Sequence, residues 1–302
     1  MVKISVILPT YNRPKMLQRT LYSLLRQKEK DYEICICNDD DKETHKQTED
    51  VVNEFINLGM PIQYFYTGQY KRGEGWSVET YPYNVGIRHA TGDLVILNSG
   101  DVMSISNSIN FHRHYQTRDG ADGKLVVFST VHGLTPETQE KIDEYDWKNK
   151  PMSLLFKGSC EYMYCGIGVS FSNRFETEES FRPYHYQMSI RKNVILEIGG
   201  FDEDFYGKIP GGDDDLWCRL KRYGCRPFYA ANILAVHQNH VLTEKLTTKG
   251  FAYSNPKAPL NFWEIDRQFC DIHRNTTHEW GQYPRDMKNL PELLSMPHIF
   301  KP

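Results

Sequence analysis

Side chains that carry hydroxyl, amide or carboxylate oxygens follow three short apolar segments of the sequence. Groups of this kind can bind a polar ligand together if the fold brings the three segment ends to one place. The side chains are Thr10 and Asn12 after segment 2–8, Asp39 and Asp40 after segment 32–37, and Asn98-Ser99-Gly100-Asp101 after segment 94–97.

The stretches around these side chains predict alternating strands and helices. The short apolar run at 2–8, rich in Val and Ile, and the short runs at 32–37 and 62–66 are typical of buried strands. Stretches with apolar residues at helical spacing separate them, and the first of these could begin at Asn12 as its N-cap. Alternating strands and helices predict a parallel sheet, to which 94–97 adds a fourth strand. Ligands bind beyond the carboxyl ends of such strands, so the polar side chains should face one crevice.

Two further groups of possible functional residues lie later in the chain. Asp213-Asp214-Asp215 precede a stretch with helical spacing, and the positive end of a helix dipole would explain part of this acidic cluster. His237 directly follows a short apolar run, and His240 comes three residues later. A single histidine is more often structural than a ligand, so the histidines alone decide nothing.

Composition limits the class of protein. The 302 residues are 39% hydrophobic and 25% charged, which is enough for a globular core, and a net charge of -3 gives no basic excess for nucleic-acid binding. No window reaches the length of an apolar membrane span, and the first residues lack a signal-peptide pattern. The seven cysteines show no pairing pattern. We expect a cytoplasmic protein without a transmembrane segment, and an oligomer remains possible in principle.

Four segments, in this order, resemble the family 2 glycosyltransferases of the GT-A fold. The resemblance covers roughly residues 2–240 and implies a Rossmann-like, mostly parallel α/β sheet flanked by helices. The resemblance also implies a domain that spans residues 1–245. Its first part, about 1–102, would bind the nucleotide-sugar, and its second part, about 103–245, would bind the acceptor and carry catalysis. An irregular C-terminal extension, 246–302, would pack on this domain. The segments are ISVILPTYNRP, YEICICNDDD, YNVGIRHATGDLVILNSGD, and SIRKNVILEIGGFDEDFYG with GGDDDLWCRLKRYG.

The resemblance implies a nucleotide-sugar donor, with UDP as its nucleotide. Asp39 falls where the family has a carboxylate that accepts a hydrogen bond from uracil N3–H, and a charged acceptor strengthens that bond. The alternative is a solvated acidic turn, which is our interpretation of Asp40 and Asp41. The glycine-rich, basic segment 70–76 could close over the diphosphate or be a plain loop. The expected donor-binding residues are Pro9, Thr10, Asn12, Asp39, Arg72, Asn84, Ser99 and Gly100.

The resemblance also implies a divalent cation, Mn²⁺ or Mg²⁺, that bridges the donor phosphates and neutralises the leaving nucleoside diphosphate. The family's Asp-x-Asp triplet falls on residues 99–101, where the first aspartate is replaced by Ser99. Asp101 remains as the anchor for the metal, and Ser99 could contribute its hydroxyl, a water or a ribose contact. Asn98 is a second, less preferred substitute for the missing first aspartate. The expected metal ligands are Asp101, His237 and His240, with His237 preferred.

Inverting transfer needs a carboxylate that takes the proton of the acceptor hydroxyl. Matching the family pattern back from Leu216 and Arg219 places this base on Asp213, with Asp214 as the reserve. Gly212 stands where the family usually has a glutamate. The residues expected to bind the acceptor, a glycan or another hydroxyl-bearing molecule, are Asp214, Asp215 and Trp217.

The expected function is therefore an inverting glycosyltransferase of the hexosyltransferase type. One alternative is a sugar nucleotidyltransferase, which would need a glycine-rich loop after the first strand to hold a triphosphate, and residues 9–14 contain no glycine. The other alternative is a non-catalytic nucleotide- or carbohydrate-binding protein of the same fold that lost a metal carboxylate at Ser99. Retention of Asp101, Asp213 and His237 favours the enzyme.

Overall fold

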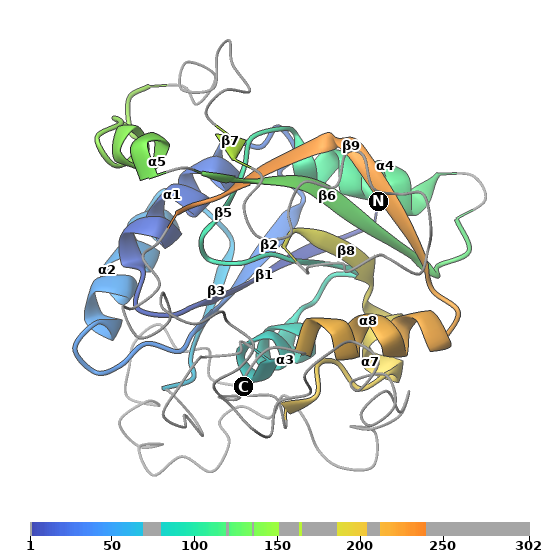
Figure 1. Ribbon diagram of the computed structural model, residues 1–302. Helices are drawn as coiled ribbons and strands as arrows, with labels where there is room; N and C mark the ends of the chain where they lie inside the picture. The colour runs from blue at the N-terminus through green and yellow to red at the C-terminus, as the bar shows by residue number, and fades with distance from the viewer. Residues whose placement is uncertain are drawn as a thin grey trace, which may run out of the picture.

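The computed structural model describes residues 2–68, 80–118, 121–134, 136–150, 163–164, 186–203 and 212–239. Within these ranges the chain forms one mixed sheet with helices on both faces, which confirms the predicted α/β class (Figure 1). None of the helices in these ranges has the length and apolar character needed to cross a membrane. Arg72, His240 and the extension 246–302 lie outside the described residues, and residues 212–214 are described by their backbone alone.

Four parallel strands form the first half of the sheet, in the spatial order β3-β2-β1-β4. The predictions for the third and fourth strands match the observed bounds. The first strand has the predicted length but lies two residues later, because Pro9 and Thr10 still pair with β2 and the turn begins only after them. The strands are β1 (Ile4–Thr10), β2 (Tyr32–Asn38), β3 (Ile62–Tyr66) and β4 (Leu94–Leu97).

Two hydrophobic layers hold the helices against this sheet. Leu17 and Leu21 of α1 pack with Phe55 of α2 on one face, where α4 also contributes. On the other face, α3, α7 and α8 pack around Phe65, Val95 and their neighbours. A further helix, α5, contributes Ile142 to the first layer. The helices are α1 (Pro14–Leu25), α2 (His45–Asn57), α3 (Thr80–His89), α4 (Ser108–Thr117), α5 (Pro136–Asp143), α7 (Lys192–Glu197) and α8 (Gly212–Arg222).

The second half of the sheet is mixed, and it curls. The antiparallel strand β8 lies between β4 and β6, and β9 runs parallel to β6. Strand β5 follows β4 directly in sequence but pairs with β9 at the far end of the sheet, so the end of β9 returns to the turn after β4. The strands are β5 (Val102–Ser104), β6 (Leu125–Leu134), β7 (Met163–Tyr164, paired with β6), β8 (Met188–Arg191) and β9 (Arg226–His237).

The strand directions fix the direction of α8. Strand β6 is parallel to β4 because β8 is antiparallel to both. A tight turn at 223–225 joins α8 to β9, which is parallel to β6, so α8 runs back along the sheet in the opposite sense. Trp217 of α8 lies against Phe128, with ring centroids 5.8 Å apart, and Phe128 is level with Leu97 at the end of β4. The N-terminus of α8 therefore lies at the edge where β1, β2 and β4 end.

A buried ion pair anchors α8. Asp215 accepts hydrogen bonds from Nε and Nη2 of Arg219 at 2.9 and 2.7 Å, and neither side chain is exposed to solvent. The guanidinium also donates to the carbonyl oxygen of Ile198 at the end of α7. Two buried charges are stable only when each is paired and hydrogen-bonded, so this cluster ties α8 to α7.

We expect Arg219→Met to lower the free energy of unfolding by about 3–5 kcal/mol, because it leaves the Asp215 carboxylate buried without its counter-charge. Urea denaturation followed by circular dichroism measures the change. The matched control is Arg222→Met on an exposed position of the same helix, for which we expect a change of less than about 0.5 kcal/mol. Equal losses in the two variants would contradict the role of the buried pair.

Candidate functional site

The loops that follow β2 and β4 are both fastened to the end of β1. The Asp39 backbone N–H donates to the Thr10 carbonyl oxygen at 2.9 Å, and the Gly100 N–H donates to the Pro9 carbonyl oxygen at 2.9 Å. The three polar segments identified in the sequence therefore meet at one edge of the sheet. This is the arrangement expected for a ligand site in a parallel α/β sheet.

Gly100 makes this close approach possible. A Cβ atom at residue 100 would lie 2.9 Å from the Pro9 carbonyl oxygen and 3.0 Å from the Thr10 Cβ, closer than side-chain carbons normally approach. Gly100 was predicted to contact the donor. The structure shows a packing reason for the glycine, namely that the turn 98–101 crosses directly over the end of β1.

Thr10 and Asp39 present their side chains at this edge. The Thr10 hydroxyl is buried and has no hydrogen-bond partner within the described part of the chain. The Asp39 carboxylate is also buried, and its Oδ1 accepts a hydrogen bond from the Thr67 hydroxyl at 2.8 Å. A carboxylate has further lone pairs to offer, so Asp39 can accept an additional donor group from a ligand.

Asn12 and Asp40 join the loops after β1 and β2 to each other. The predicted N-cap role of Asn12 and the predicted solvated position of Asp40 are wrong, whereas the donor contact of Asn12 stays a prediction. Asn12 does not cap α1, whose N-cap is Arg13; instead its backbone lies in the left-handed region, with φ of 49°. Its backbone N–H donates to Asp40, and its side chain exchanges hydrogen bonds with Asp41. Asp40 is buried, not solvated, and also accepts a hydrogen bond from Thr48. Burial raises the pKa of the Asp40 carboxyl, against the opposing effect of these hydrogen bonds.

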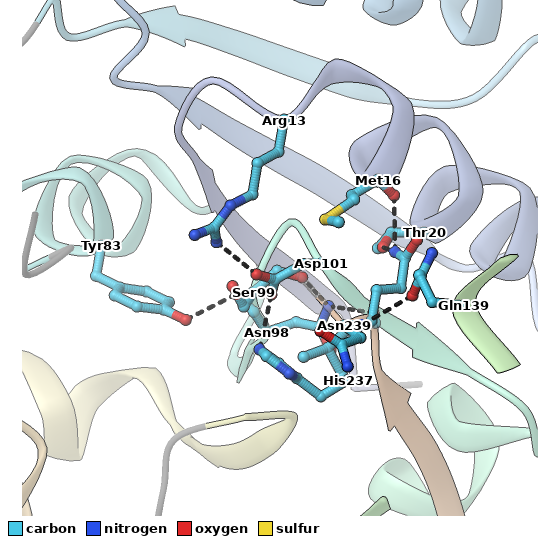
Figure 2. A network of polar contacts seen from close by, with 12 residues as sticks. Arg13, Met16, Thr20, Tyr83, Asn98, Ser99, Asp101, Gln139, His237 and Asn239 are labelled. Carbon is cyan, nitrogen blue, oxygen red and sulfur yellow. Dashed lines mark hydrogen bonds and ion pairs between the residues drawn. The ribbon is translucent and has the colours of Figure 1, made fainter. Parts of the chain in front are cut away.

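Asp101 lies between a guanidinium and an imidazole (Figure 2). Arg13 Nη1 donates to Asp101 Oδ2 at 2.7 Å, and His237 Nε2 lies 3.6 Å from Asp101 Oδ1. The Asp101 side chain is 3% exposed, that of His237 22% and that of Arg13 33%, so the buried carboxylate has partly exposed partners. The structure thus brings together Asp101 and His237, the two described members of the predicted metal set, from distant positions in the sequence.

The curled sheet sets the position of His237. Val102, directly after Asp101, pairs with His237 across β5 and β9. The Gln238 N–H donates to the Asp101 carbonyl oxygen at 2.9 Å, and the Gln238 side chain donates to the Met16 carbonyl oxygen of α1 at 3.0 Å. The Tyr186 ring packs against the imidazole at 5.1 Å between centroids. These contacts fix the end of β9 beside the turn that carries Asp101.

Asn98 supports the turn from inside. Its side-chain amide donates to the carbonyl oxygens of Ser99 and Val102 at 2.8 and 3.0 Å, and its Oδ1 accepts from Gln187 Nε2 at 3.2 Å. Gln187 is buried with a left-handed backbone, φ of 55°, a costly conformation that needs support from its surroundings. The contacts of Asn98 make it part of the scaffold of the turn. Ser99 is buried next to it, at 3% exposure.

Asn84 joins two elements instead of facing the crevice. Its side-chain amide donates to the Phe201 carbonyl oxygen at 2.8 Å and to Glu203 Oε1 at 3.0 Å, while its Oδ1 accepts from the Phe201 N–H. The side chain is fully buried. The predicted donor contact therefore needs correction, since Asn84 positions α3 against the segment that leads towards α8.

The predictions for α8 separate into two groups. Asp215 and Trp217 were expected to bind the acceptor, but Asp215 is buried in the pair with Arg219 and Trp217 packs against Phe128. Both residues fasten the helix. Asp213 and Asp214 lie in its first turn, at the edge of the sheet that carries Asp39 and Asp101. Their side chains lie outside the described atoms, so their roles stay predictions.

The chemistry of the Asp101 and His237 pair suits a divalent cation. A carboxylate oxygen is a hard ligand for Mn²⁺ or Mg²⁺, and an imidazole nitrogen is a further ligand that Mn²⁺ accepts. Within the described ranges no group of three or more His, Cys, Asp or Glu side chains could hold a metal ion. The two protein ligands would leave coordination positions for donor phosphate oxygens, and His240 lies outside those ranges.

Sequence reasoning missed Arg13, Gln187 and Gln238. Arg13 carried a signal, since it is a cation in the loop directly after β1. Gln187 and Gln238 carried none, because their importance comes from partners distant in the sequence: Gln187 contacts Asn98 and Gln238 contacts Asp101.

Comparison with known proteins agrees with this geometry. The sequence profile of glycosyl transferase family 2 matches residues 5–152. A GalNAc(5)-diNAcBac-PP-undecaprenol beta-1,3-glucosyltransferase of Campylobacter jejuni is 30% identical over 265 residues, which cover 88% of this chain and 73% of the relative.

Two solved structures share the fold. The mannosyltransferase PcManGT from Pyrobaculum calidifontis, in complex with GDP-Man and Mn²⁺, superposes with a TM-score of 0.50 at 14% identity, over 78% of this chain and 57% of that one. GalNAc-T7 with UDP, GalNAc and Mn²⁺ gives a TM-score of 0.54 at 14% identity, over 86% and 47%. This chain thus spans about half the length of these solved chains. The sheet is that of the GT-A glycosyltransferases, and the chain belongs to glycosyl transferase family 2.

Proposed function

We propose that the chain is an inverting glycosyltransferase that moves a sugar from a UDP-sugar to an acceptor hydroxyl. One observation carries the proposal: Thr10, Asp39 and Asp101 lie at the ends of three neighbouring parallel strands, and backbone hydrogen bonds join these ends to one another. His237 reaches the same place from β9. A nucleoside diphosphate presents a base, a ribose and two phosphates in a row, and this edge offers polar groups in a corresponding row.

The β1 and β2 ends would bind the nucleoside. The buried Thr10 hydroxyl lacks a partner among the described residues and can bond to a ligand without breaking a contact. Asp39 would accept the N3–H of uracil, a bond that the negative charge of the carboxylate strengthens. The neighbouring Asp40 serves a different purpose, because it holds the loop through Asn12 and Thr48.

The β4 and β9 ends would bind the diphosphate through a divalent cation. Asp101 and His237 would hold the ion, and when bound it neutralises the negative charge of the leaving nucleoside diphosphate. The two structural neighbours contain Mn²⁺, and in both the ligand set includes a nucleotide or nucleotide-sugar. The Asp101 carboxylate is nearly excluded from solvent, where its electrostatic attraction for a cation is stronger than in water.

Asp213 would act as the general base. A single displacement needs a carboxylate near the acceptor hydroxyl, on the side of the sugar opposite the leaving group. The direction of α8 supports this role, since its first turn lies at the edge of the sheet that carries Asp39 and Asp101. The buried pair of Asp215 with Arg219 and the packing of Trp217 fix that turn in place. The acceptor-binding role remains with Asp214.

A panel of donors tests the proposal. The protein is incubated with UDP-, GDP- and dTDP-sugars in the presence of Mn²⁺, and released nucleotide is measured; UDP-glucose comes first because the Campylobacter relative is a glucosyltransferase. We expect nucleotide release with a UDP-sugar and none after chelation of the metal. A parallel incubation with sugar 1-phosphate and UTP would yield pyrophosphate only if the chain were a nucleotidyltransferase. Absence of release from every donor would refute the transferase proposal.

We expect Asp213→Asn to lower the transfer rate about 10²- to 10⁴-fold, because the amide cannot take the acceptor proton. Donor affinity should stay within a few-fold of the wild type. Single-turnover transfer and calorimetric donor binding measure the two quantities. Asp214→Asn is the matched comparison on the adjacent residue, and a larger loss of rate there than in Asp213→Asn would move the base to Asp214.

We expect Asp101→Ala to abolish the part of donor binding that depends on the metal, with a loss of affinity of at least about 10-fold. The physical reason is that the variant removes the anchoring oxygen ligand. Calorimetry with UDP, in the presence and absence of Mn²⁺, measures the effect. Unchanged metal-dependent binding in the variant would remove Asp101 from the site.

A further inference from the structure

We propose that Arg13 is a built-in counter-cation for Asp101, which a divalent cation displaces, and that the released guanidinium then binds the donor diphosphate. The inference rests on the metal site proposed at Asp101 and deepens it. It assigns to Arg13, a residue outside the predicted site, a role both in metal binding and in donor binding.

Arg13 binds one oxygen of the carboxylate that would hold the metal, and His237 faces the other oxygen. Its Nη1 lies 2.7 Å from Asp101 Oδ2, while His237 Nε2 lies 3.6 Å from the other oxygen of the same carboxylate (Figure 2). A carboxylate that is 3% exposed requires a nearby positive charge, because an isolated buried charge is costly. In the metal-free protein the guanidinium supplies that charge. A divalent cation held by the same carboxylate would lie close to the guanidinium and repel it, so the two cations compete for Asp101.

The side chain of Arg13 can move while its backbone stays fixed. The Arg13 carbonyl oxygen accepts hydrogen bonds from the Met16 and Leu17 N–H groups at 3.1 and 3.0 Å, which anchors it to the first turn of α1. The side chain is 33% exposed, in contrast to the buried carboxylate that it contacts. Movement of the side chain away from Asp101 leaves these backbone hydrogen bonds in place.

The displaced guanidinium would remain within reach of the phosphates. A diphosphate bound through the metal at Asp101 must lie next to that carboxylate, and Arg13 already spans the distance to it. The planar guanidinium forms paired hydrogen bonds with phosphate oxygens, which suits this second partner. Arg13 would thus weaken metal binding in the absence of donor and strengthen donor binding once the metal is present. Both effects favour the state in which metal and donor are bound together over the state in which the metal is bound alone.

The test compares the two partners of one ion pair. Mn²⁺ is titrated into the metal-free full chain, and the free ion is measured by electron paramagnetic resonance. Without nucleotide, we expect Arg13→Gln to tighten Mn²⁺ binding about three- to tenfold and Asp101→Asn to weaken it. A purely structural role would give losses in both variants. The matched control is Lys15→Gln, which removes the same charge from an exposed position two residues away and should change the affinity by less than about twofold.

A second measurement uses UDP. With saturating Mn²⁺, we expect Arg13→Gln to bind UDP about three- to tenfold more weakly than the wild type, and Arg13→Lys to lie between them, since it keeps the charge without the planar fork. Circular dichroism verifies that each variant is folded. An Mn²⁺ affinity of Arg13→Gln equal to or below that of the wild type without nucleotide would overturn the proposal. Failure of the wild type to use any donor would refute the transferase function but leave the opposite responses of Arg13 and Asp101 to Mn²⁺ intact.

Discussion

The end of β1 carries a hydrogen-bonded neighbour on each side, and the positions of the other site residues follow from this constraint. The Asp39 N–H bonds to the Thr10 carbonyl oxygen, and the Gly100 N–H bonds to the Pro9 carbonyl oxygen. Neither loop can move along the sheet without losing a backbone hydrogen bond in a buried place, which is costly. Thr10, Asp39 and Asp101, which lie far apart in sequence, are therefore held in a fixed order along one edge.

Charge at this edge is organised around buried carboxylates with different surroundings. Burial raises the pKa of the Asp40 carboxyl, and this carboxyl holds the loop together through its hydrogen bonds. Asp101 is buried next to a guanidinium and an imidazole. Asp215 has its own arginine within α8. Of these three, Asp101 is the carboxylate whose cationic partner reaches solvent, and this makes it the one suited to an exchange of partners.

The sequence predicted the parts of the fold that local patterns determine. Short apolar and aromatic runs defined the strands at 62–66 and 94–97 with correct bounds, and the parallel order placed Asp39 and Asp101 at one edge. The antiparallel strand β8 and the return of β5 to β9 were not predicted, because pairing between distant strands leaves no periodicity in a single sequence. The convergence of Asp101 and His237 was expected from the family resemblance, and the curl of the sheet is its physical cause.

Errors in the predicted site arose where the partner of a side chain does not follow from its residue type. Asn12 has the residue type of an N-cap, yet it bonds to Asp40 and Asp41 on another loop. Asp215 belongs to an acidic cluster by sequence, but its partner Arg219 lies one turn away on the buried face of α8. Arg13 was passed over because its ion pair with Asp101 joins residues 88 positions apart. The residue type at a position determines which contacts are possible, and the fold determines which of them forms.

In the turn 99–101, packing against the end of β1 requires glycine at the middle position. Ser99 and Asp101 on either side are the positions at which the family has its metal-binding aspartates. Gly100 is confined by the Pro9 carbonyl oxygen and the Thr10 side chain, so no other residue fits there without a shift of β1. The flanking residues, Ser99 and Asp101, both carry side chains with polar oxygens. An aspartate could therefore give way to Ser99 during divergence while the turn kept its path and Asp101 kept its place. A lineage could in this way adjust how strongly it depends on a metal by single replacements at residue 99, leaving the framework of the sheet unaltered.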